Sequence, residues 1–243
     1  MALITVPTNF SFTTVTKFGL DRATNVLRSH YTGQMQRVSY PYAVWVFEGT
    51  LVPYDTGNAA AIRSFFSKLE GQKNSFRLPV PGYVVPQSGY NINLNTTASA
   101  VARATSVIVG GGVANGLYLV EGDYITINDE LKIVTANSPF SNTGTATIAF
   151  IPPLRKVVAI GTSVISVNPS MLMTAADDKV ANWGITAPYR HALKLNAVED
   201  ISNTIYSPPV FVAPVYTPVR KTIDGGFANN SYTTSFYNTG GAS

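Results

Sequence analysis

The segment from Tyr42 to Pro79 constrains the fold most, because it carries the signals of a strand, a helix and a second strand in close succession. Residues 42–52 are rich in aromatic and β-branched side chains, as β-strands are, and Pro53 ends that run. Residues 74–79 are typical of a second, shorter strand that prolines close. The segment therefore predicts two strands of a β-sheet, joined by the connection at 53–73.

Those intervening residues predict one amphipathic helix. Apolar side chains recur there near the helical period of 3.6 residues, and Gly71 provides a stop signal. Three polar residues ahead of the run can accept hydrogen bonds from the first helical amides: Asp55, Thr56 and Asn58. The side chains expected in the core between this helix and the strands are Trp45, Phe47, Ile62, Phe66, Leu69 and Phe76. A helix packed on a sheet is scaffold rather than chemistry.

The residues before this segment alternate short strand-like runs with turn residues. The expected strands are 10–16, 23–28 and 34–40, followed by the strand that contains Trp45. Turn and strand-breaking residues separate them: Gly19, Gly33 and Pro41. We expect a mainly β fold with an N-terminal β-sandwich-like sheet domain and one buttressing α-helix.

A change of amino-acid composition after residue 80 marks a predicted domain boundary. Residues 80–95 form a connector rich in Pro, Gly and Asn. Short strand signals with local turns follow it, and Asn128, Asp129 and Glu130 are expected to supply a hairpin turn. The expected strands are 105–109, 116–120, 124–127, 131–134 and 145–151. They predict an inserted small β-barrel or sandwich domain at 81–169.

The residues after 169 are expected to return to the first domain. Residues 191–199 favour a strand over a helix, since polar residues separate most of the apolar ones. We therefore predict a sheet domain built from 1–80 together with 170–200. Residues 201–243 are expected to form an extended C-terminal arm that contacts other subunits, with a flexible tail as the alternative. Its proposed contact residues are Tyr206, Phe211, Tyr216, Phe227, Tyr232 and Phe236.

Composition excludes several functional classes. Charged residues make up only 12% of the chain, about half the usual share. Either partner proteins cover much of the molecular surface, or the surface is that of a β fold rich in Thr and Asn. The net charge of +4 comes from scattered residues, which argues against specific nucleic-acid binding. The chain has no cysteine, no apolar run long enough to span a membrane and no basic region that would begin a signal peptide.

Residue patterns that carry chemistry are weak. His30 and His191 lack neighbouring metal ligands at helical or hairpin spacing, so both are expected to be structural. Asp177 and Asp178 are adjacent and are expected to cap a turn. The glycine-rich residues 110–116 lack the Gly-Lys-Ser/Thr ending of a phosphate-binding loop. We expect no enzyme activity, no catalytic residue, no cofactor and no metal.

Three motifs resemble tailed-bacteriophage tail structural proteins of the distal tail or minor tail protein family. The first runs from Thr32-Gly33-Gln34 to Trp45 and is followed by the helix and the strand at 74–79. The second combines residues 121–125 with 131–136 and 148–155. The third is the sequence Ile-Asp-Gly-Gly at 223–226. Together and in order, they span most of residues 30–226.

This resemblance implies a virion component of the phage tail, assembled in the cytoplasm of the host bacterium. Members of the family form a ring, expected to be a hexamer of identical chains, that joins the tail tube to the tail tip or baseplate hub. The implied partners are other copies of the chain, tube proteins, and hub or tip proteins, with no membrane span and no specific nucleic acid. The present chain departs from better-known distal tail proteins in its length and its C-terminal arm.

Two other functions remain open. A receptor- or glycan-binding module on a virion surface would use Tyr and Trp rings on β loops to stack on sugars. A polysaccharide hydrolase would need two carboxylates from distant positions, such as Asp123 and Asp177.

Overall fold

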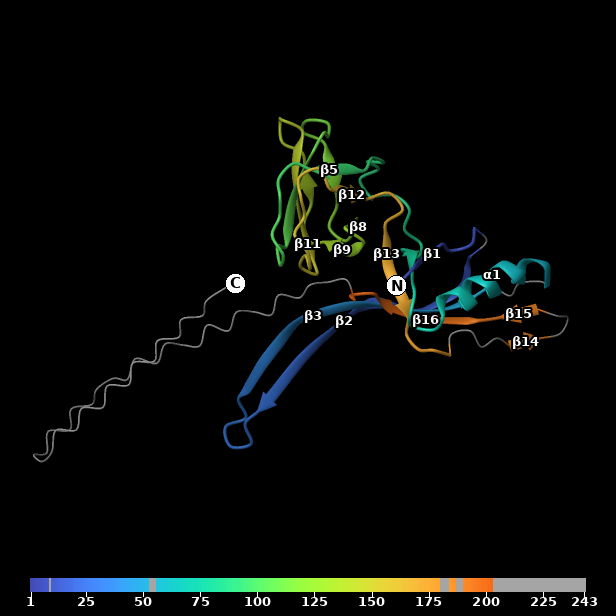
Figure 1. Ribbon diagram of the computed structural model, residues 1–243. Helices are drawn as coiled ribbons and strands as arrows, with labels where there is room; N and C mark the ends of the chain where they lie inside the picture. The colour runs from blue at the N-terminus through green and yellow to red at the C-terminus, as the bar shows by residue number, and fades with distance from the viewer. Residues whose placement is uncertain (9, 53–55, 180–183, 187–189, 203–243) are drawn as a thin grey trace, which may run out of the picture. The chain divides into compact units, whose positions relative to one another are not determined.

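The computed structural model describes residues 1–8, 10–52, 56–179, 184–186 and 190–202 (Figure 1). The described chain is mainly β with one helix, as the sequence predicts. The C-terminal arm and its six proposed contact residues, Tyr206, Phe211, Tyr216, Phe227, Tyr232 and Phe236, lie outside the described residues.

One six-stranded sheet forms the first layer, in the order β1-β4-β13-β16-β3-β2. Both β13 and β16, which come after the barrel described below, lie between β4 and β3. The prediction of a strand at 191–199 is thus confirmed, since β15 and β16 cover most of it. The strands are β1 (Leu3–Ile4), β2 (Phe12–Arg28), β3 (Met35–Leu51), β4 (Ser75–Pro79), β13 (Ser170–Ala175) and β16 (Lys194–Glu199), with a separate pair of β14 (Gly184–Thr186) and β15 (Arg190–Ala192).

Helix α1 (Thr56–Leu69) joins β3 to β4 and buries its apolar stripe in the core of the sheet. The helix ends where predicted: Glu70 and Gly71 both have positive φ, and a Cβ at Gly71 would lie 2.4 Å from the carboxylate of Asp178. Asp55, one of the predicted cap residues, lies outside the described residues. Trp45, Phe47, Ile62, Phe66, Leu69 and Phe76 are each at most 2% exposed.

The prediction of four short N-terminal strands is wrong, because they merge into one hairpin of two long strands. β2 and β3 pair from Phe12↔Leu51 to Arg28↔Met35. Gly19 lies within the ladder opposite Val46 and does not break it. Pro41 is tolerated because it falls at a register shift between the pairs Arg22↔Ala43 and Thr24↔Ser39, where it has no cross-strand partner.

The residues between β4 and β13 form a closed six-stranded barrel in the order β11-β6-β5-β12-β8-β9, which decides between the predicted barrel and sandwich. β8 and β9 form the predicted hairpin, whose turn residues Asn128 and Asp129 both have positive φ, as a two-residue turn of this kind requires. Glu130 was expected in that turn but begins β9 instead. The strands are β5 (Leu94–Thr96), β6 (Ser106–Gly110), β8 (Tyr124–Ile127), β9 (Glu130–Val134), β11 (Thr145–Ile151) and β12 (Ser163–Ile165), with the small pair β7 (Leu117–Leu119) and β10 (Ser138–Pro139) beside them.

The barrel has its own hydrophobic core and also contributes to the core of the sheet. Leu131 is fully buried among sheet residues, and Tyr124 and Ile133 pack against the same cluster. The indole of Trp45 donates a hydrogen bond to the Leu131 carbonyl at 2.9 Å. Contacts between β8–β9 and the sheet therefore attach the barrel to the scaffold.

Candidate assembly interface

The distal part of the β2–β3 hairpin is the most exposed structure in the described chain. β16 pairs with β3 only from Val46 to Thr50, so the hairpin continues beyond the sheet as a two-stranded segment (Figure 1). We call residues 21–43 the ribbon. Its strand at 21–28 spans roughly 26 Å at about 3.3 Å per residue.

Apolar side chains on the ribbon are uncovered on both of its faces. The register places Val26 opposite Arg37, and Met35 opposite Arg28, on one face. Leu27 and Val38 fall on the other face, because side chains alternate along a strand. These four residues and Tyr31 at the turn are each at least 42% exposed, and Tyr31 is fully exposed. Within the described residues, neither face of the ribbon has a covering layer.

The ribbon also presents open backbone edges. β2 is the last strand of the sheet, so its outer edge has no partner strand in the described part of the chain. The outer edge of β3 likewise has no partner strand among the described residues from Met35 to Tyr42, whereas at Ala43 and Trp45 side chains already bond its backbone. Unpaired edges of this length are suited to pairing with another chain.

Positive charge adds to this surface. The ribbon carries three arginines, at positions 22, 28 and 37, against one acidic residue, Asp21. Asp21 is already paired with Lys17 at 3.2 Å. No salt bridge involves the three arginines within the residues that the structure describes. Their charges are available to a partner with acidic groups.

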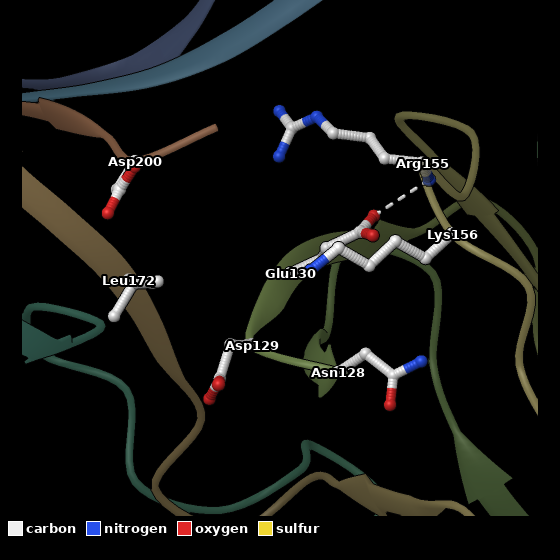
Figure 2. A pocket seen from close by; sticks show the side chains of 7 residues that line it. All are labelled: Asn128, Asp129, Glu130, Arg155, Lys156, Leu172 and Asp200. Carbon is white, nitrogen blue, oxygen red and sulfur yellow. Dashed lines mark hydrogen bonds between the residues drawn. The ribbon is translucent and has the colours of Figure 1, made fainter. Parts of the chain in front are cut away.

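A second candidate is a small cavity where the barrel meets the sheet (Figure 2). It has a volume of about 80 Å³, and its lining residues include Asp129, Glu130 and Asp200. Asp129 forms a bidentate ion pair with Arg77, at 2.9 and 3.0 Å. Burial would raise the pKa of Asp200, but hydrogen bonds from Ser202 and Ser75 outweigh burial and lower it. The carboxylates of Asp129 and Asp200 are thus already partnered, whereas Glu130 Oε1 is buried without a hydrogen-bond partner in the part of the chain that the structure describes.

Glu130 belongs to a buried ion pair. Its Oε2 accepts a hydrogen bond from the Arg155 backbone N–H at 3.0 Å (Figure 2). The same oxygen accepts a hydrogen bond from the Lys132 ammonium at 2.7 Å. Burial lowers the pKa of Lys132, although Glu130 opposes that shift. No cluster of three or more metal-ligating side chains occurs among the described residues. The cavity is therefore a structural junction.

The residues singled out for chemistry have structural surroundings where they are described. Asp178 accepts a hydrogen bond from the Gln72 amide and Asp177 from the Lys179 amide, so both cap turns as predicted. Asp123 is fully buried, and its carboxylate accepts hydrogen bonds from two backbone amides. His30 is exposed in the ribbon turn, whereas the side chain of His191 is outside the described parts.

The glycine-rich loop is shaped by packing. A Cβ at Gly112 would lie 2.0 Å from the ring of Phe140, so this position brings the backbone close to an aromatic side chain. The ribbon is not among the sites that the sequence predicts, because Gly19, Gly33 and Pro41 divide its residues into short separate runs. A signal of it is present in residues 34–40, where Met35, Arg37 and Val38 leave no consistently apolar face.

No helix in the described part of the chain is long and apolar enough to cross a membrane. Comparison with protein-family models and with curated proteins finds no match to this chain.

Proposed function

We propose that this chain is a structural component of a bacteriophage tail that assembles with copies of itself into a ring, joining the tail tube to the tail tip or baseplate hub. The observation that carries the self-assembly is the uncovered ribbon. The three motifs given above support the second part of the proposal, which places the assembled ring in a phage tail.

The physical basis is that an isolated two-stranded hairpin is at best marginally stable in water. The ribbon exposes Val26, Leu27, Met35 and Val38 on two faces and leaves both outer edges open. A neighbouring subunit would cover the apolar side chains and pair with an open edge. In a ring, each copy would give this surface to the next, so that every ribbon is covered.

The glycan-binding alternative has less support. Sugar stacking uses exposed aromatic rings. Among the aromatic side chains of the barrel and its surroundings, Tyr118, Phe140 and Phe150 are at most 3% exposed, and Tyr90 and Tyr124 are partly buried. Among the described residues, Tyr31 is the one aromatic side chain of the strongly exposed set, and it lies on the ribbon. We therefore keep assembly as the single proposed function.

The experiment compares two triple variants by light scattering of the purified full chain. The ribbon variant carries Leu27→Ser, Tyr31→Ser and Val38→Ser. The control removes three exposed apolar residues from loops around the barrel, through Val101→Ser, Val113→Ser and Val157→Ser. We expect the full chain and the control to form a closed oligomer, and the ribbon variant to be monomeric with an unchanged circular dichroism spectrum.

Equal loss of assembly in both variants would mean that exposed apolar area in general, rather than the ribbon, drives association. A full chain that remains monomeric at all accessible concentrations would contradict spontaneous self-assembly. The tail assignment has its own test: an antibody against the barrel should label the tails of purified phage particles at one axial position in electron micrographs. Labelling of heads alone, or of no particles, would contradict it.

A further inference from the structure

The place where the ribbon leaves the sheet has an unusual hydrogen-bonding pattern. β16 pairs with β3 down to Val46, and beyond that point no strand continues the ladder on this side. The next outward-facing backbone groups of β3 belong to Trp45 and Ala43, because residues two apart in a strand point to the same side. Without a neighbour, these groups would be left without partners at the edge of a buried core.

Two side chains take the place of the missing strand. Glu199, at the end of β16, accepts a hydrogen bond from the Trp45 amide at 3.1 Å. Arg155, which follows β11 of the barrel, donates to the Ala43 carbonyl at 2.8 Å and to Glu199 Oε2 at 2.6 Å. A second nitrogen of the guanidinium donates to Glu199 Oε1. The fork of Arg155 thus joins the barrel, β16 and the root of the ribbon.

Burial makes this connection strong and directional. The side chains of Arg155 and Glu199 are 7% and 2% exposed, so water offers little competition for their hydrogen bonds. The backbone of Arg155 is held in turn by Glu130, which pairs with the fully buried Lys132. A chain of charge-assisted contacts therefore runs from the interior of the barrel to residues 43–45 of β3.

We infer that Arg155 is a positioning residue through which the barrel fixes the root of the ribbon. The inference that Arg155 orders the ribbon concerns the single chain. Its effect on assembly rests on the proposed function. The contact holds the direction in which the ribbon leaves the sheet, and thereby the presentation of its interface.

Hydrogen exchange of backbone amides in the full chain tests this inference. In Arg155→Met, the amide of Trp45 and those ribbon amides at 22–28 and 35–43 that are hydrogen-bonded across the β2–β3 ladder should exchange about tenfold faster, as expected when a hydrogen bond at the root is lost. The amides of β4, β13 and the barrel strands should keep their rates. Arg155→Lys keeps the charge but lacks the planar fork, so it should restore the ribbon only in part.

The matched control is Arg77→Met. Arg77 also connects the sheet to the barrel, through its bidentate pair with Asp129, but it lies on β4 and away from the ribbon root. Arg77→Met should leave ribbon exchange unchanged. Equal acceleration in both arginine variants, or in all amides of Arg155→Met, would show a general loss of stability and would overturn the inference.

If Arg155→Met does not fold, the paired variant with Arg155→Met and Glu199→Met removes both charges together and leaves neither buried alone. Faster exchange confined to the ribbon supports the inference in that background, and unchanged ribbon exchange overturns it. This result is independent of the proposed function when it is measured in the ribbon triple variant, which is designed to prevent assembly and leaves Arg155 and Glu199 unchanged. If the full chain does not assemble, the proposed function fails, but the exchange pattern still tests the inference about Arg155.

Discussion

The ribbon and the barrel solve the problem of open strand edges in opposite ways. In the barrel each of the six strands has two neighbours, and residues such as Val109, Ile125 and Ile148 are fully buried. The ribbon has two strands, no third neighbour among the described residues, and apolar side chains on both faces. Barrel side chains thus stabilise the single chain, whereas ribbon side chains gain burial only from a partner. The following predictions test this difference, beginning with the largest effect.

Trp45→Ala should destabilise the single chain by about 3–5 kcal/mol, the usual cost of removing a large buried aromatic side chain. Trp45 is 1% exposed, stacks on Phe18 with ring centroids 5.2 Å apart, and donates its indole N–H to Leu131. Chemical denaturation followed by circular dichroism measures the change. An unaltered melting temperature would mean that the junction between sheet and barrel is not packed as described.

Lys132→Met should destabilise the chain by about 3 kcal/mol, because it leaves the buried carboxylate of Glu130 without its countercharge. The comparison is Lys17→Met on β2, whose ion pair with Asp21 is more than half exposed and should contribute less than about 1 kcal/mol. Both variants are measured by urea denaturation. Equal effects would show that the Lys132 pair is hydrated and does not belong to the closed interior.

Local patterns in the sequence predicted much of the fold. The helical period of Ile62, Phe66 and Leu69 located α1, and the turn residues Asn128 and Asp129 located the β8–β9 hairpin. In both cases the residues that determine the structure are close to one another in the sequence. The barrel strand at 145–151 was likewise predicted with its observed bounds.

Features that depend on distant pairing could not be predicted in this way. Gly19 and Pro41 are local strand-breaking signals, yet β2 and β3 continue through them because cross-strand hydrogen bonds outweigh local propensity. The contact between Arg155 and Glu199 joins residues 44 positions apart, and nothing in either neighbourhood indicates the other. The ribbon and its root, which carry both proposals, are therefore the parts least visible in the sequence.

Alkaline pH should lower the folding stability through tyrosines of the buried interior, by less than the two substitutions above, whereas the exposed Tyr31 of the ribbon should contribute little. Burial raises the pKa of Tyr118 and Tyr124 above the usual value of about 10. Above about pH 10 the unfolded chain loses these protons before the folded chain does, so stability should fall as pH rises. Lys132, with its lowered pKa, acts in the opposite direction over the window between its folded and unfolded pKa values.

Urea denaturation between pH 8 and pH 11, conditions set by the tyrosine pKa of about 10, gives the measurement. Tyr118→Phe should flatten the decline in stability at alkaline pH. It should also cost about 1 kcal/mol at neutral pH, since the hydroxyl is hydrogen-bonded to Ser166 at 3.2 Å. Tyr31→Phe, at the exposed turn of the ribbon, is the control. A Tyr118→Phe variant with the same pH dependence as the wild type would contradict the assignment to buried tyrosines.

The smallest effect on the single chain should come from the ribbon itself. Val26→Ser should change the free energy of unfolding in dilute solution by no more than about 0.5 kcal/mol, because the side chain is half exposed and has no covering layer among the described residues. Val113→Ser on a barrel loop, exposed to a similar extent, should behave alike. The two should diverge at concentrations where the chain assembles, with only Val26→Ser raising the concentration needed for association. A cost of 2 kcal/mol or more for Val26→Ser in the dilute chain, about the size expected for a buried position, would mean that the chain already covers its own ribbon and that no partner is needed to explain it.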